Sequence, residues 1–374
     1  MARPTRPLVL SCACALALVL LALLLPLTSL SEESPAATGL AASAHDGLIM
    51  NTGGSVWYGA DGWLWFDAFA PFADRLHVVT RVPLQQVLEE HVDFQMADGE
   101  DRWFDVPMAA PLPEALVVDL QGTTQGFAGL DANMYLYERG DLILRTFDHT
   151  SARSLHLDQP ISQTYRIQLE ALDPSTCTLR VGSGQSPYLT QPLDDYAFLL
   201  VSDSGPLSDR EIARIEQFVE AGGNLVAMAQ LIDSESWYWA SNFEALNEIL
   251  NGCGIQFTGQ HLTTTLTTMA NRQTINILTD IRAHAITQSV DEVVSTGSTL
   301  QLSGSAQGLV FDDQGDPVIA VSRLGRGQCL AIGTGIGFNT NFALRQNDTL
   351  AANIVEWASV RSTYVIFLPM VLRG

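Results

Sequence analysis

Few residues in this chain have the type and spacing that a catalytic site requires. Beyond the N-terminal region, three cysteines (Cys177, Cys253 and Cys329) are too widely spaced for a disulfide framework or a metal site. None of them has a general base nearby in the sequence, so thiolate chemistry is not indicated. We expect all three to be buried apolar cysteines.

His284 is the histidine that most resembles a catalytic base, because Asp280 and Asp291 flank it. We expect instead a turn histidine whose hydrogen bonds are made locally. Residues 333–337 are glycine-rich but lack the spacing of a dinucleotide fingerprint. Residues 312–316 are rich in Asp but lack the glutamate that completes an EF-hand, so they predict a hairpin turn. No metal and no cofactor are therefore expected.

The chain is strongly acidic. It has 41 Asp and Glu against 19 basic residues, all of them Arg, for a formal net charge of -22. The lack of lysine excludes P-loop lysines, Schiff-base lysines and Ser-Lys dyads. An acidic chain without a basic stripe repels phosphate, so no nucleic-acid partner is expected. We interpret the excess acid as keeping an exported protein in solution.

The elements that must position any site begin with a strand, helix and strand pattern over residues 194–230. Residues 197–201 form an apolar run bounded by turn residues, as in a strand covered on both faces. Ser208 then predicts an N-cap with Glu211 three residues later, followed by apolar residues at helical spacing. Residues 225–229 are the next apolar run. This span of about 35 residues is that of a right-handed βαβ unit.

The pattern resembles class I glutamine amidotransferase-like domains, in particular a non-catalytic kind found in exported bacterial proteins and in a gliding-motility-associated transporter component. The resemblance covers residues 189–359 and includes the motifs LNEILNGCGIQF (246–257), HAITQSV (284–290), GRGQCLAIG (325–333) and NDTLAANIVEW (347–357). It implies a flavodoxin-like parallel sheet. In active members a Cys follows the second strand, with His and Glu downstream. Here residues 228–231 read MAQL, so the resemblance implies a domain without glutaminase activity.

Residues 86–185 alternate between apolar and polar and are rich in turns, which predicts a β-sandwich. The candidate strands are 116–120, 133–137, 142–147 and 164–169, with a hairpin turn at 138–141. The region resembles the bacterial pre-peptidase C-terminal domain, a small jelly-roll module of secreted enzymes, in the segments RWFDVP (102–107), LVVDL (116–120), LDANMYLY (130–137) and QTYRI (163–167). The resemblance implies a binding or docking role. Asn133 replaces the second Asp of the usual pair, which weakens any case for a bound cation.

We predict that this sandwich is inserted into the α/β domain. Residues 45–85 carry the pattern of a first βαβ half, with strand, helix and strand at 47–51, 64–73 and 76–82. The domain would resume at 188–360, so that strands 76–82 and 197–201 share one sheet. Two consecutive domains are the alternative. The predicted fold class is α/β plus β, a flavodoxin-like parallel sheet with an inserted or preceding jelly-roll β-sandwich.

The two ends of the chain suggest export. Two arginines precede an apolar run over residues 8–27, the layout of an export signal that is also long enough to stay as a membrane anchor. We expect residues 1–31 to be a signal peptide or anchor and 32–44 a linker. The membrane would be contacted only through this segment, if it is uncleaved. The apolar tail at 361–374 is too short to span a bilayer and is either an envelope-attachment signal or an edge strand.

Aromatic residues provide the main ligand-binding signal. Trp237 and Tyr238 follow the second strand of the opening motif, at its carboxyl end, where open α/β sheets place ligands. With Gln230 and His284 they are the expected ligand-binding residues, and no catalytic residue is expected. Two functions stay open. One is an exported non-enzymatic binding or scaffold protein of the cell envelope, with a glycan, peptide or envelope protein as ligand; the other is a secreted hydrolase that acts on glycans or peptides through an unrecognised site.

Overall fold

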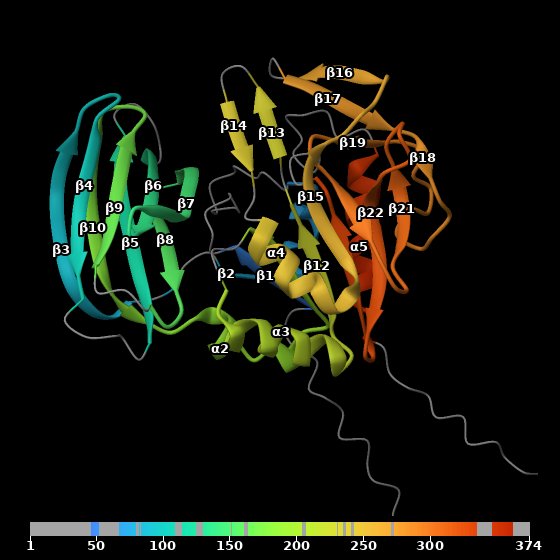
Figure 1. The fold of residues 1–374 in the computed structure, drawn as a ribbon, viewed down its shortest axis with the longest axis horizontal. Helices are drawn as coiled ribbons and strands as arrows, with labels where there is room; N and C mark the ends of the chain where they lie inside the picture. Colours follow the sequence, from blue (N-terminus) through green and yellow to red (C-terminus); the bar gives the residue numbers. More distant parts are fainter. Residues whose placement is uncertain are drawn as a thin grey trace, which may run out of the picture. The chain divides into compact units, whose positions relative to one another are not determined.

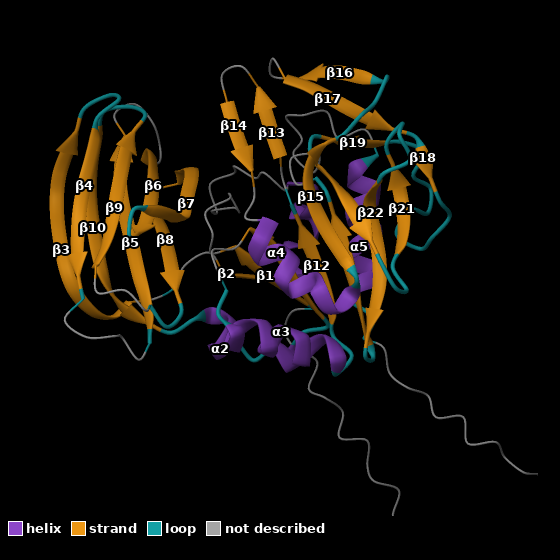
Figure 2. Ribbon diagram, in the orientation of Figure 1, coloured by secondary structure: helices purple, strands orange, loops and turns teal. Residues whose placement is uncertain are grey.

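A computed structural model gives the fold, and strands dominate it while helices are few and short (Figure 2). The predicted signal or anchor, the linker and the C-terminal tail lie outside the described residues. No described helix combines the length and apolar character needed to cross a membrane. The structure describes residues 46–51, 67–79, 82, 84–108, 114–124, 130–150, 152–160, 164–203, 207–229, 231–234, 237–240, 243–270, 273–334 and 346–361.

The largest sheet has eight strands in the order β18-β21-β22-β23-β12-β11-β1-β2 (Figure 1). The five neighbours from β23 to β2 run parallel to one another. The other three strands are joined to them through antiparallel pairs. The strands are β1 (Gly47–Asn51), β2 (Leu76–Val79), β11 (Phe198–Asp203), β12 (Asn224–Met228), β18 (Asp280–Ile281), β21 (Gln307–Phe311), β22 (Pro317–Leu324) and β23 (Gly327–Ile332).

The predicted fold class, α/β plus β with a flavodoxin-like parallel sheet and an inserted or preceding jelly-roll, is wrong. The main sheet is mixed, and most other strands lie in separate antiparallel sheets. Two tight hairpins cause the mixing, one at residues 312–316 between β21 and β22 and one at residues 325–326 between β22 and β23. Short turns join antiparallel strands, whereas parallel neighbours need a long crossover.

Strands β2 and β11 lie on either side of β1, so residues 76–79 and 198–203 share one sheet although the two sandwich sheets separate them in sequence. This sheet membership is as expected. The predicted domain boundaries stay a prediction.

Helix α3 (Asp209–Glu220) connects β11 to β12, as the local pattern predicted. The Ser208 Oγ accepts a hydrogen bond from the Glu211 N–H, and the Glu211 carboxylate accepts one from the Ser208 N–H, which completes the capping box. Ile215 and Phe218 of α3 are buried. The other helical segments are η1 (Asp67–Arg75), α2 (Pro187–Thr190), η2 (Leu193–Asp195), α4 (Phe243–Leu250), η3 (Asn251–Cys253) and α5 (Asn347–Ala358).

Apolar side chains cover both faces of the eight-stranded sheet. In β11, Phe198 and Leu200 belong to a core that includes residues of α5. Leu199 and Val201 belong to a second core that includes residues of α3 and α4. Strands covered on both faces have continuous apolar runs, which is why these segments lack alternation.

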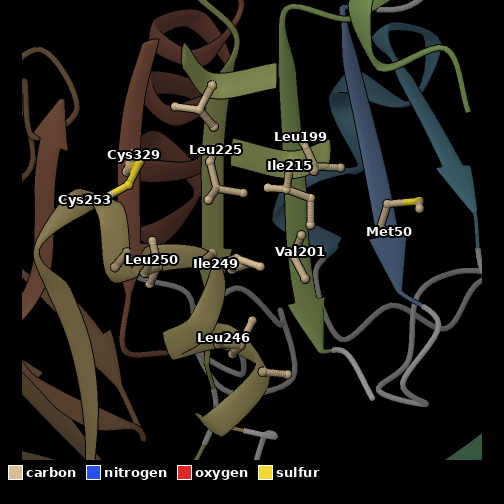
Figure 3. Packing of buried hydrophobic residues seen from close by; sticks show 14 of the residues in the cluster. Met50, Leu199, Val201, Ile215, Leu225, Leu246, Ile249, Leu250, Cys253 and Cys329 are labelled. Atoms are coloured by element: carbon tan, nitrogen blue, oxygen red, sulfur yellow. A yellow bond between two sulfur atoms is a disulfide. The ribbon is translucent and has the colours of Figure 1, made fainter. Parts of the chain in front are cut away.

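The second core contains a disulfide that the sequence did not predict. Cys253, which follows α4, is bonded to Cys329 of β23, with the two Cα atoms 6.3 Å apart. Figure 3 shows the bond beside Leu250 and near Leu225. The expectation that none of the three cysteines forms a disulfide is therefore wrong; among the described cysteines, Cys177 is outside the disulfide bond. The partners are 76 residues apart in sequence, so only the tertiary fold brings them together.

Residues 84–184 form two four-stranded antiparallel sheets around one core, in the orders β3-β10-β5-β8 and β4-β9-β6-β7. Alternate residues of β9, such as Tyr165 and Ile167, are buried. The predicted hairpin turn joins β6 to β7, with positive φ angles at Arg139 and Gly140. The strands are β3 (Leu84–Met96), β4 (Asp101–Pro107), β5 (Ala115–Thr124), β6 (Leu130–Glu138), β7 (Asp141–Thr150), β8 (Ala152–Leu157), β9 (Thr164–Ala171) and β10 (Ser175–Gly184).

Three small antiparallel sheets complete the described residues. Their orders are β13-β14, β15-β20 and β16-β17-β19. All their strands lie between β12 and β21 in the sequence. The strands are β13 (Leu231–Ser234), β14 (Trp237–Ala240), β15 (Ile255–His261), β16 (Thr267–Ala270), β17 (Gln273–Leu278), β19 (Val293–Ser295) and β20 (Ser298–Leu302).

Candidate functional site

The carboxyl ends of the parallel strands are where the sequence placed a ligand. The chain goes from β1 to β2 on one side of β1 and from β11 to β12 on the other, so its direction across the sheet reverses between β1 and β11. Open sheets bind ligands at such reversals. Asn51 and Asp203 are paired in register there, and the buried Ser202 hydroxyl has no hydrogen-bond partner among the residues that the structure describes. Residues 52–66 and 204–206, which follow these strands, lie outside the described part of the chain.

The chain after β12 does not have the geometry of a nucleophile elbow. Met228 and Ala229 are buried, and the Ala229 N–H donates to the Ile332 carbonyl. The chain then enters β13, which pairs with β14 as an antiparallel hairpin. A nucleophile elbow needs a strand that turns sharply into a helix, and backbone N–H groups at that turn stabilise the oxyanion. Here a hairpin replaces the helix, and no Cys, Ser or Thr occurs before Ser234.

His284 lies in the turn after β18, where neighbouring residues form its hydrogen bonds. The Nδ1 of its ring accepts a hydrogen bond from the Ile286 backbone N–H at 3.2 Å, and the backbone N–H of His284 donates to the Thr287 Oγ1 at 3.0 Å. Burial lowers the pKa of His284, which favours the neutral form of its ring. Among the described contacts, no hydrogen bond joins His284 to Asp280 or Asp291. This geometry is that of a locally satisfied turn histidine.

His284 also lines an open cavity of about 570 Å³ beside β20 and β21. Arg282 lines it as well, and the Arg282 guanidinium carbon lies 4.2 Å from the ring centroid of Phe311. No Ser, Thr or Cys is among the described residues that line this cavity, so it offers His284 no acyl nucleophile. Strands β21, β22 and β23 separate β18 from β12. In strand order, His284 therefore follows an edge strand of the sheet, whereas the chain after β12 follows a strand inside it.

The two aromatic residues expected to bind a ligand lie in the β13–β14 hairpin. Trp237 is paired with Ser234, and Tyr238 with Asp233. The hairpin follows the carboxyl end of β12, which is where the sequence placed these residues. The side chains of Trp237 and Tyr238, and the whole of Gln230, lie outside the described part of the chain. Their role in ligand binding stays a prediction.

A second cavity, of about 890 Å³, lies beside α3, α4 and β15. Four carboxylates line it together with Phe243 and Phe257, and no Arg or His is among its described lining residues. Burial, Glu244 and Asp209 raise the pKa of one of these carboxyls, that of Glu248. An anionic ligand would be repelled from this cavity. The four carboxylates belong to Asp209, Glu216, Glu244 and Glu248.

A buried cluster surrounds Glu211, and no local sequence pattern predicts it. The His156 Nε2, from β8, lies 3.1 Å from the Glu211 carboxylate, which also accepts a hydrogen bond from the Ser186 hydroxyl. The His156 and Glu211 side chains are 2% and 0% exposed. Burial raises the pKa of Glu211, but the hydrogen bond and charge of His156, with donors from Ser186 and Ser208, outweigh it and lower the pKa overall.

This cluster has the residue types of a hydrolase triad but not its geometry. In a triad the serine bonds to the histidine, and substrate must reach the serine. Here Ser186 and Ser208 bond to the carboxylate, and the Ser208 Oγ also donates to the Asp158 Oδ2 at 2.6 Å. His156 and Glu211 are closed to solvent. We therefore interpret the cluster as structural.

Comparison with known proteins adds no function. No protein family and no curated protein matches the sequence. The N-terminal domain of mmIFT52 matches at 13% identity over 49% of this chain and 86% of that chain, with a TM-score of 0.37. A cytoplasmic protein of Salmonella typhimurium matches at 11% identity over 47% and 78%, with a TM-score of 0.35.

A third match is a beta-galactosidase from Bacillus circulans sp. alkalophilus, at 15% identity over 46% of this chain, with a TM-score of 0.31. This chain spans only 24% of the length of that enzyme. Scores this low carry no argument about what the chain does. None of these three proteins is described as an amidotransferase, so that family resemblance stays a prediction.

Proposed function

We propose that this chain is an exported, non-enzymatic binding or scaffold protein of the cell envelope. The observation that carries the proposal is the path of the chain after β12, which enters a hairpin instead of a helix. Acyl transfer needs a nucleophile, a base and an oxyanion hole in one place. In the described residues the end of β12 has no nucleophile, and three strands lie between β12 and β18, the strand that precedes His284. The end of β12 can therefore bind a ligand, but its described residues include no nucleophile that could react with it.

The disulfide supports the exported location. Disulfides persist in oxidising compartments and are rare in the cytosol. The Cys253–Cys329 bond lies within a buried core and joins segments 76 residues apart in sequence, as expected of a structural disulfide. The N-terminal apolar run predicted as a signal or anchor agrees with this location, and contact with a membrane is proposed only through that run.

The proposed ligand is a glycan, a peptide or another envelope protein. A nucleic-acid ligand is disfavoured by the formal net charge of -22 and by the carboxylate-lined cavity beside α3 and α4. The proposal includes no metal and no cofactor.

The test is to measure binding and turnover on the same preparation. The purified protein is screened on glycan and peptide arrays, and any ligand found is incubated with the protein while products are followed by mass spectrometry. We expect saturable binding without products, and no release of ammonia from glutamine. The His284→Ala variant should likewise form no products, with Arg323→Ala, an exposed residue of β22, as the matched control. Turnover that His284→Ala abolishes and Arg323→Ala retains would contradict the proposal.

A further inference from the structure

The sandwich sheet β4-β9-β6-β7 has one outer face on which aromatic and polar side chains share neighbouring register positions. Trp103 of β4 is paired with Gln168 of β9, which is paired with Tyr135 of β6. In the next row, Arg166 of β9 lies between Asp105 of β4 and Tyr137 of β6. Because side chains alternate along a strand, all these residues point to the same side of the sheet. We call Trp103, Tyr135, Tyr137, Arg166 and Gln168 the aromatic face.

Trp103 is at the centre of the contacts on this face. Its side chain is 46% exposed. The Tyr137 ring lies beside it, with the two ring centroids 5.3 Å apart. The Arg166 guanidinium carbon lies over the Trp103 ring, 4.7 Å from its centroid, and the Arg166 Nε donates to the Asp105 Oδ1 at 2.8 Å. The indole is thus supported on two sides while part of its surface stays open to solvent.

Hydrogen bonds hold the rest of the face in place. The Tyr137 hydroxyl donates to the Gln168 Oε1 at 2.8 Å, and the Gln168 Nε2 donates to the Asp101 Oδ1 at 3.1 Å. The Tyr135 hydroxyl donates to the Glu170 Oε2 at 2.7 Å. Side chains that are ordered before binding lose less conformational entropy when a ligand arrives. The aromatic face is therefore preorganised.

Stability of the sandwich core does not account for an exposed tryptophan. In β4 the buried Val106 and the partly buried Phe104 pack on the core, while Trp103 points the other way. The apolar surface continues to Leu142 of β7, which is paired with Tyr137 and is 45% exposed. Contiguous exposed apolar surface rimmed by polar groups marks an interaction site.

We propose that the aromatic face binds a neutral glycan chain. A pyranose ring has an apolar face of C–H groups that packs flat on an indole or phenol ring, and it has hydroxyls around its rim. Gln168, Arg166 and Asp101 offer amide, guanidinium and carboxylate groups beside the rings to bond those hydroxyls. Neighbouring strands lie about 4.8 Å apart, so the rings of β4 and β6, with the polar side chains of β9 between them, can contact a chain of several sugars. This inference rests on the proposed binding function and names its ligand class.

The charge of the face favours a neutral sugar over an acidic one. Three described carboxylates lie on this side of the sheet, those of Asp101, Asp105 and Glu170, and the basic positions are Arg166 and, paired with Tyr135, Arg145 of β7. A uronate would meet net repulsion. A peptide that added a strand would need a free sheet edge, because backbone groups within the sheet are already paired. The edge of β4 could accept such a peptide, but the aromatic face would not take part.

The experiment is calorimetric titration of the purified full chain with cellohexaose, chitohexaose and maltohexaose, and with hexagalacturonate as the anionic comparison. The variants are Trp103→Ala, Trp103→Phe and, as control, Val92→Ala, which removes a 59% exposed apolar side chain from β3. Thermal unfolding of every variant shows whether it is folded. Trp103→Phe keeps a ring at the same position, so it separates loss of stacking from loss of structure.

We expect at least one neutral hexasaccharide to bind more tightly than hexagalacturonate. Trp103→Ala should weaken that binding by about tenfold or more, as for other central aromatic anchors. Trp103→Phe should restore most of it, and Val92→Ala should leave it unchanged. Absence of binding by all three neutral sugars, tighter binding of hexagalacturonate, or equal affinity of Trp103→Ala would overturn the proposal.

The same titration separates this inference from the proposed function. If the hexasaccharides bind through Trp103 and are then cleaved to shorter sugars, the proposed non-enzymatic function is wrong, but the proposal that the aromatic face binds a glycan is supported. If Trp103→Ala binds them as well as the unaltered protein does, without cleavage, the binding function stands and the aromatic face is wrong.

Discussion

The strand ends of the eight-stranded sheet and the aromatic face of the sandwich differ in how they use their side chains. At the end of β12, Met228 and Ala229 are buried and the chain continues into a hairpin. On the aromatic face, Trp103 is open to solvent and a network of polar side chains surrounds it. The eight-stranded sheet thus has a strand order at which ligands often bind, but the described end of β12 has no reactive side chain. The exposed aromatic and polar side chains are on a different sheet. Each prediction below changes one of these regions or the contacts behind it.

The largest effect is expected from breaking the buried Glu211 cluster. Glu211→Ala leaves His156, Ser186 and Ser208 without their shared acceptor, and loss of one partner of a buried pair costs about 3–5 kcal/mol. Chemical denaturation measures the loss of unfolding free energy. Glu220→Ala, an exposed residue of the same helix, is the control and should change it by less than about 0.5 kcal/mol. Equal stability of the two variants would show that the cluster is not structural.

The disulfide should come next in size. Replacing both Cys253 and Cys329 with Ser should cost about 2–4 kcal/mol, because the cross-link restricts the unfolded chain. A reductant should lower the unfolding midpoint of the original protein but not that of the double variant. A reductant effect of the same size on both proteins would mean that the bond does not stabilise the fold. Glycan binding at the aromatic face should be unaffected, since the cysteines lie in another core.

The stabilising effect of Glu211 should also depend on pH. The pKa of this carboxyl is lower in the folded protein than in the unfolded chain, so its stabilisation is complete above the unfolded pKa of about 4.3. The stabilisation is lost as pH falls through the folded pKa. The difference in unfolding free energy between the original protein and Glu211→Gln should therefore shrink as the pH falls below about 4.3. A difference that widens on acidification would contradict the direction of this pKa shift.

The smallest effect is expected at the rim of the aromatic face. Tyr137→Phe keeps the ring beside Trp103 but removes the hydroxyl that bonds to Gln168. One such hydrogen bond contributes about 0.5–1.5 kcal/mol, and partial exposure places this one at the low end. We expect glycan affinity to fall about twofold to threefold, with little change in thermal unfolding. If Tyr137→Phe lost as much affinity as Trp103→Ala, the hydrogen bond that orders Tyr137 and Gln168 would control affinity, and not the stacking of the sugar on the rings.

Local features were readable from the sequence, and long-range ones were not. The Ser208 and Glu211 capping box and the turn at Arg139 and Gly140 depend on residues within three positions of each other, and both are confirmed. The Cys253–Cys329 bond and the contact of His156 with Glu211 join segments far apart in sequence, and no local pattern predicts them. The mixed sheet was missed for a related reason. The hairpin at 312–316 was predicted, but its effect on strand direction depends on which strands it joins.

Alternation along the strands is the sequence signal that points to the aromatic face. In the segment RWFDVP, Phe104 and Val106 alternate with Trp103 and Asp105. If Phe104 and Val106 face the core, then Trp103 faces the solvent, because side chains alternate along a strand. The same period places Tyr135 and Tyr137 together on one side of β6. What the sequence did not show is that β9 lies between β4 and β6. That strand order brings Gln168 and Arg166 between the aromatic rings.

The most direct test compares the two regions in one titration. The tightest-binding neutral hexasaccharide is titrated into the original protein, into Trp103→Ala and into His284→Ala, with products followed in the same samples. We predict that only Trp103→Ala loses affinity, by about tenfold or more, and that no sample forms products. Loss of affinity in His284→Ala alone, or product formation that His284→Ala abolishes, would place the function in the eight-stranded sheet and contradict this account.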